Sequence, residues 1–135
     1  MRFSVKRVLA AFAVAACVAA PVMADTSQHS NAISSGGAYS TTPITKKSSA
    51  TGAPALMNFT SFTNYDSKPS DHPLAARVRT AAGVAASGVA SVYGTGTYTL
   101  SYYSGYGIYG ENYVGRVATH TDSTKGAAFT VNFTP

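Results

Sequence analysis

Two histidines in this sequence lie close to carboxylates, and acid–base and metal sites are built from this combination. His120 and Asp122 are separated by one residue, so a strand end would place both side chains on the same side. Asp71 directly precedes His72. A metal or acid–base site needs three or more converging groups, however. We therefore expect a capped turn at the first pair and a capped helix start at the second, with no enzymatic activity, metal or cofactor.

The densest aromatic stretch is SYYSGYGIYGENY, residues 101–113, with five tyrosines and three glycines. One interpretation is a hairpin whose tyrosines bury their rings and keep their hydroxyls in water. Another is a recognition surface, because Tyr, Gly, Ser and Asn are typical of binding loops. A third is a self-assembly face, since residues 92–117 carry only two charges and have high strand propensity. The candidate binding residues are Tyr102, Tyr103, Tyr106, Tyr109 and Tyr113, with Arg116 as a polar anchor.

The first 24 residues are typical of a secretory signal peptide. A basic start precedes an apolar run shorter than the roughly 20 residues that span a bilayer. We expect cleavage after Ala24 and a secreted or periplasmic protein, and the Ala-rich form is typical of bacteria. The alternative is an outer-membrane lipoprotein, because VAAC ending at Cys17 resembles a lipobox. The apolar residues after Cys17 disfavour lipidation.

Charge and cysteine content narrow the possible partners. The net charge is +5, but three basic residues lie in the leader, so residues 25–135 carry seven basic and five acidic groups, or +2. In residues 25–135 only Lys46 and Lys47 are adjacent cations, which argues against a nucleic-acid partner. The single cysteine lies in the leader, so we expect a disulfide-free domain without thiol chemistry.

The elements that would position these residues differ along the chain. Residues 25–55 contain twelve Ser or Thr among 31 residues and predict a disordered linker. Residues 56–135 predict a mainly β domain, a small antiparallel sheet arranged as a sandwich or meander. Near Thr60 and Ser61 we expect either a bulge or the meeting of two short strands. Leu74, Val78 and Ala81 fall at helical spacing and predict a short helix near 73–83. A strand through 85–93 is the alternative.

These patterns together predict a secreted, non-catalytic binding or structural protein of the cell envelope or extracellular space. Its tyrosine- and glycine-rich surface would contact a protein or glycan partner, or a second copy of the chain. We expect no transmembrane segment after signal removal. The alternative function is a small secreted antimicrobial or effector protein acting on membranes or other cells, which the Gly/Ala-rich segment 81–90 would suit.

Overall fold

The computed structural model describes residues 26–47 and 53–135, which form nine strands and no helix. The strands are β1 (Ser27–Ile33), β2 (Ala38–Ser40), β3 (Ile44–Thr45), β4 (Ala55–Asn64), β5 (Leu74–Thr80), β6 (Ala90–Val92), β7 (Gly96–Leu100), β8 (Asn112–Ala118) and β9 (Ala127–Thr134). All strand pairs are antiparallel. The described ranges accordingly contain no helix that could cross a membrane. The prediction of a mainly β fold is confirmed.

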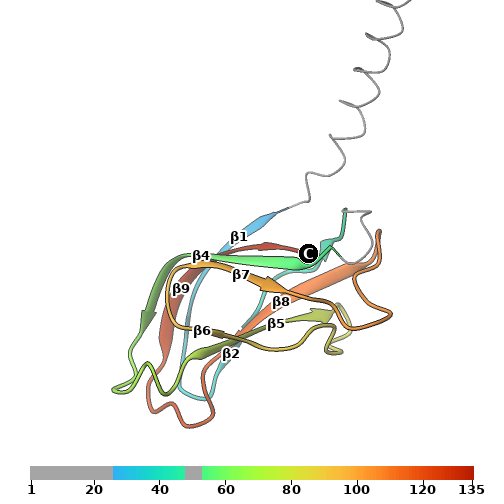
Figure 1. The fold of residues 1–135 in the computed structure, drawn as a ribbon. Coiled ribbons are helices and arrows are strands. Elements are labelled where there is room, and N and C mark those ends of the chain that lie inside the picture. The colour runs from blue at the N-terminus through green and yellow to red at the C-terminus, as the bar shows by residue number, and fades with distance from the viewer. Residues whose placement is uncertain (1–25, 48–52) are drawn as a thin grey trace, which may run out of the picture.

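The strands form two sheets that pack face to face as a sandwich (Figure 1). One sheet has the order β1-β9-β4-β7, and the other has the order β2-β8-β5-β6 with β3 also paired to β8. The C-terminal strands β7, β8 and β9 do not pair with one another. Both β7 and β9 pair with β4, whereas β8 pairs with β5. Of the two arrangements expected from the sequence, the sandwich is therefore the one formed.

Alternating side chains of the two sheets meet in one core. Phe129, Val131 and Phe133 of β9 are buried, as strand alternation predicts. Strand β4 contributes Met57 and Phe59, and its register shifts just after Phe59, at the expected bulge. The facing sheet contributes Leu74, Ala76, Val78, Tyr113 and Val117. Burial of each large apolar side chain stabilises the fold by about 1.5–3 kcal/mol.

Residues 74–80 form strand β5, so the prediction of a helix near 73–83 is wrong. Leu74, Ala76 and Val78 are buried and alternate with more exposed residues, which is a period of two. Positions four residues apart share a face in a helix and also in a strand, so the spacing from Leu74 to Val78 fits both. Pairing with β6 on one side and β8 on the other decides for the strand.

Residues 26–47 form β1, β2 and β3, so the prediction of a disordered linker over 25–55 is wrong for this part. Strand β1 pairs with β9 along its whole length, from Ser27 to Ile33. An edge strand held by a complete backbone ladder needs few apolar side chains, and here only Ile33 is buried. The predicted leader, 1–24, and the linker residues 48–52 lie outside the described residues.

Candidate functional site

The Tyr/Gly segment, residues 101–113, connects β7 to β8 and crosses from one sheet to the other, so it is not a hairpin. Tyr113 anchors this segment in the core. This side chain is fully buried, and its hydroxyl oxygen accepts hydrogen bonds from the backbone N–H groups of Gly107 (2.8 Å) and Ile108 (2.9 Å). The hydroxyl donates to Glu111 at 3.2 Å. One buried phenol thus satisfies two loop amides and fixes the conformation of the segment.

Tyr102 is a second anchor of the segment. Its ring centroid lies 5.0 Å from that of Tyr113, and the Lys46 Nζ lies 4.9 Å from the Tyr102 ring centroid, a cation–π contact. The Tyr102 hydroxyl is buried and has no hydrogen-bond partner among residues 26–47 and 53–135. Burial, with Tyr113 nearby, raises the pKa of Tyr102 above its usual value of 10.0. This side chain supports the loop and does not offer its hydroxyl to a ligand.

Replacing Tyr102 by phenylalanine is expected to raise the free energy of unfolding by about 1 kcal/mol, because a buried unpaired hydroxyl is removed and the ring is kept. The pKa of Tyr102 is higher in the folded protein than in the unfolded chain, where it is about 10.0. The contribution of the neutral phenol to the free energy of unfolding is therefore complete below pH 10.0 and is lost as the pH rises toward the folded-state pKa. Tyr102→Phe has no phenol to ionise, so its free energy of unfolding should fall less at alkaline pH than that of the wild type. Urea unfolding of both proteins at neutral pH and above pH 10.0 measures both effects. A less stable variant at neutral pH would contradict the expectation.

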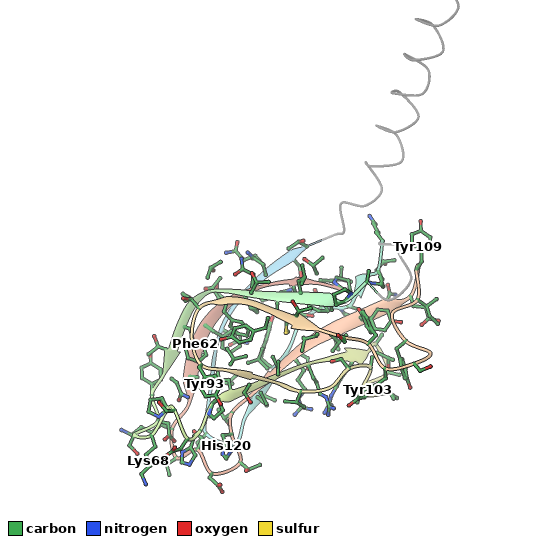
Figure 2. All side chains as sticks on the ribbon, in the orientation of Figure 1. Phe62, Lys68, Tyr93, Tyr103, Tyr109 and His120 are labelled. Carbon is green, nitrogen blue, oxygen red and sulfur yellow. The ribbon has the colours of Figure 1, made fainter. Side chains whose placement is uncertain are left out.

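The five predicted tyrosines do not form one surface. Tyr102 and Tyr113 are anchors, and Tyr106 is half-buried against the core. Tyr103 and Tyr109 are exposed by 48% and 63%. Figure 2 shows Tyr109 at the upper right of the molecule and Tyr103 at the lower right, well apart. The two exposed tyrosines are therefore available to different contacts.

Arg116, the predicted polar anchor, belongs to a row of arginines on the outer face of the second sheet. This arginine row consists of Arg77 and Arg79 on β5 and Arg116 on β8, with Arg77 directly opposite Arg116 in register. These are all the arginines that follow the predicted leader. Like charges directly opposite each other destabilise a sheet. The arginine row thus destabilises the sheet, so its presence is better explained by binding than by folding.

The guanidinium groups of the row are short of partners. No carboxylate of the described residues forms an ion pair with them. The Nε atoms of Arg77 and Arg79 are buried without a hydrogen-bond partner in the described part of the chain, while Arg77 Nη2 donates to the Ser87 carbonyl at 3.1 Å. Burial, with Arg116 and Arg77 nearby, lowers the pKa of Arg79. Desolvated, unpaired N–H donors of this kind favour binding of an anion.

Two shallow hollows adjoin at Val89, whose side chain is exposed by 56%. One hollow, of about 240 Å³, is lined by the arginine row and by small side chains of β5 and β8. The other, of about 350 Å³, lies between the edge strands β6 and β7 and is lined by Tyr103. We call the combined region the arginine–tyrosine surface; it comprises Arg77, Arg79, Val89, Tyr103 and Arg116.

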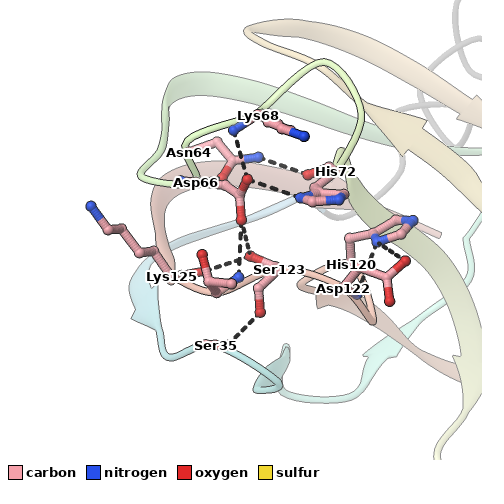
Figure 3. A network of polar contacts seen from close by, with 10 residues as sticks. Ser35, Asn64, Asp66, Lys68, His72, His120, Asp122, Ser123 and Lys125 are labelled. Carbon is pink, nitrogen blue, oxygen red and sulfur yellow. Dashed lines mark hydrogen bonds and ion pairs between the residues drawn. The ribbon is translucent and has the colours of Figure 1, made fainter.

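A second polar cluster lies where the β4–β5 loop meets the β8–β9 loop (Figure 3). The Asp66 side chain, only 1% exposed, accepts hydrogen bonds from the backbone N–H groups of Lys68 (2.8 Å) and Thr124 (3.0 Å). It also accepts one from Nδ1 of His72 at 2.9 Å. The Lys68 N–H, followed by His72, holds the pKa of the Asp66 carboxyl well below its usual range. Asp66 therefore ties the two loops together as a buried anion.

The same cluster brings His72 to His120, which the sequence did not predict. The two rings stack with centroids 5.0 Å apart and planes 23° apart. The Asp122 backbone N–H donates to Nδ1 of His120 at 3.0 Å, which confirms the expected turn. Asp71 has no helix to cap, because the chain continues from its loop into β5. The available signal was that the Asp71–His72 and His120–Asp122 pairs both flank strands, but only the pairing of β5 with β8 places them together.

No family model and no curated protein matches this chain. Function is therefore inferred from the geometry of the arginine–tyrosine surface and of the polar cluster that contains His72 and His120.

Proposed function

We propose that this chain is an exported, non-catalytic binding protein that holds an acidic partner on the arginine–tyrosine surface. The observation that carries the proposal is the arginine row. Among the described residues, two buried Nε atoms of the row have no hydrogen-bond partner, and none of the three guanidinium groups has a carboxylate partner. Guanidinium groups bind carboxylate, sulfate or phosphate groups through paired hydrogen bonds. Such a partner would satisfy the donors and offset the repulsion between Arg77 and Arg116. Export is proposed from the signal-like residues 1–24.

The flanking residues favour an extended partner over a small molecule. Both hollows are shallow, and they adjoin along the sheet at the exposed Val89. Small-molecule sites, in contrast, enclose most of their ligand. Tyr103 adds an exposed aromatic ring beside the charges, and Tyr and Arg are the residue types that contribute most to binding energy. The partner chemistry is a row of acidic groups, as on an acidic polysaccharide or an acidic protein segment outside the cell.

Replacing Arg116 by threonine is expected to weaken binding of an acidic polymer by about tenfold or more, because one charged hydrogen-bonding group contributes about 1.5–3 kcal/mol. Removal of the like-charge pair with Arg77 should leave the fold equally stable or more stable, by about 0.2–1 kcal/mol. Calorimetric titration with polyglutamate and with polygalacturonate measures affinity and separates the two sources of carboxylate. Urea unfolding measures stability.

The control variant for charge is Lys68→Gln, which removes one exposed cation from the end of the molecule away from Tyr103 (Figure 2). It should leave the affinity nearly unchanged, and equal losses in both variants would show that only net charge matters. Tyr103→Ser should also weaken binding, whereas Tyr93→Ser, at a tyrosine exposed by 63%, should not.

Dye release from anionic vesicles would favour the antimicrobial or effector alternative. Binding without release would support the proposal.

A further inference from the structure

We propose that His72, His120 and Asp122 form a binding site for a divalent transition-metal ion of the Zn²⁺ class. The three side chains come from the two loops that meet at one end of the sandwich, away from Tyr103 (Figures 2 and 3). One ligand-type atom of each residue lies within 4.8 Å of the others. Two imidazole nitrogens and a carboxylate oxygen are donors that Zn²⁺ accepts, and three protein ligands leave one position of a tetrahedral ion open.

His72 is already oriented as a metal ligand. Its Nδ1 lies 2.9 Å from Oδ1 of Asp66, and because an ionised carboxylate can only accept, Nδ1 carries the ring proton. In the neutral ring that a metal ligand requires, the lone pair of His72 is then on Nε2, the atom that faces away from Asp66. A carboxylate behind a histidine fixes the tautomer and raises the basicity of the ligating nitrogen in metal sites. Asp66 is itself held by the backbone N–H groups of Lys68 and Thr124, so the carboxylate behind His72 is fixed in place.

The charge of the cluster suits a divalent cation. Asp66 is a buried anion, and the side chain of Asp122, which is 77% exposed, provides a second carboxylate. Metal ligation requires neutral imidazoles, so the two carboxylates would supply the charge around a bound ion. An ion of charge +2 would neutralise the cluster. The neighbouring lysines, Lys68 and Lys125, are exposed and extend into solvent.

His120 and Asp122 must move to complete the site. Nδ1 of His120 accepts the Asp122 N–H at 3.0 Å and lies 3.9 Å from Oδ2 of Asp122, so its lone pair points into the turn. The ion would replace this hydrogen bond. The ring of His120, one-third exposed, must turn out of its stack with His72, and the ligand atoms must close to about 3.3 Å, the spacing that bonds of about 2.0–2.1 Å give in a tetrahedron. The bound ion would fasten the two loops to each other.

Titration of the purified protein with Zn²⁺ by calorimetry is expected to show one ion per chain, and thermal unfolding should shift upward with Zn²⁺ concentration. His72→Ala and His120→Ala should each weaken binding by about tenfold or more, since each removes one of three ligands. The matched controls are His29→Ala, at the one histidine outside the cluster, and Asp71→Asn, at the exposed carboxylate next to His72. Both controls should bind Zn²⁺ like the wild type.

An experiment on the unmodified protein covers the case in which the alanine variants fail to fold. Substoichiometric Cu²⁺ should broaden the imidazole NMR signals of His72 and His120 before that of His29. Three outcomes would overturn the proposal. The first is the absence of Zn²⁺ binding up to about 1 mM, a concentration that corresponds to a binding free energy of only about 4 kcal/mol. The second is equal broadening of the signals of all three histidines. The third is unchanged Zn²⁺ binding by folded His72→Ala and His120→Ala variants.

Discussion

Replacing Gly115 by valine should lower the free energy of unfolding by about 3 kcal/mol or more, because the two sheets leave no room for a side chain there. A Cβ at this position would lie 2.5 Å from Cε of Met57 and 3.0 Å from ring carbons of Phe133. Both neighbours belong to the facing sheet and are fully buried. Strand β8 cannot easily shift outward, since the Gly115 N–H and C=O are both hydrogen-bonded to Thr41, at 3.0 and 2.9 Å.

Urea unfolding followed by far-UV CD measures this loss, with Gly94→Val as the matched substitution. Gly94 has no atom within 4 Å of the added Cβ and no positive φ, so valine there should cost little. Gly115→Ala should fall between the wild type and the valine variant, because the flexible end of Met57 can move away from a single methyl group. Equal stability of Gly115→Val and Gly94→Val would show that the sheets are not packed as described.

Strands whose two faces differ strongly were predictable from the sequence. Phe129, Val131 and Phe133 alternate with smaller or polar residues, and the structure buries all three. The parity change between Phe59 and Phe62 indicated the bulge that the register of β4 shows. In these stretches every second side chain is apolar and becomes buried. The local pattern is therefore enough to predict that the segment is a strand and which of its faces is buried.

Elements that depend on their partners were not predictable in the same way. Strand β5 has apolar residues at spacings that a helix also allows, and only pairing with β8 and β6 excludes the helix. Strand β1 is polar because it lies at a sheet edge, and its stability comes from the backbone ladder with β9. Composition records the side chains of a segment but carries no information on which distant strand completes its hydrogen bonds.

The candidate sites show the same limit. Arg116 was identified as a possible anchor, but its importance depends on Arg77, which the register places directly opposite it. His120 and Asp122 were recognised as a pair, and the third group, His72, reaches them only because two loops end beside each other. Sequence therefore identified some members of each cluster but not how they come together. The convergence that gives a cluster its chemistry is set by tertiary structure.

Replacing Tyr113 by alanine should lower the free energy of unfolding by about 3–5 kcal/mol, the usual cost of deleting a large buried aromatic ring. The more informative variant is Tyr113→Phe, which keeps the ring against Tyr102. It leaves the backbone N–H groups of Gly107 and Ile108 without their acceptor. Loss of an acceptor for buried or half-buried donors costs about 1–3 kcal/mol. The difference between the two variants separates the contribution of the ring from that of the hydroxyl.

The Tyr113 hydroxyl should stabilise the loop but contribute little to the affinity for the acidic partner. Tyr103 is held separately, since its N–H donates to the Ala86 carbonyl at 2.8 Å, so the arginine–tyrosine surface should survive Tyr113→Phe. Hydrogen exchange at Gly107 and Ile108 should become faster, while the affinity for polyglutamate stays within about twofold. Unchanged exchange at both amides would mean that contacts other than the phenol order the segment. A large loss of affinity would instead mean that the whole crossover loop, and not Tyr103 with the arginine row, forms the recognition surface.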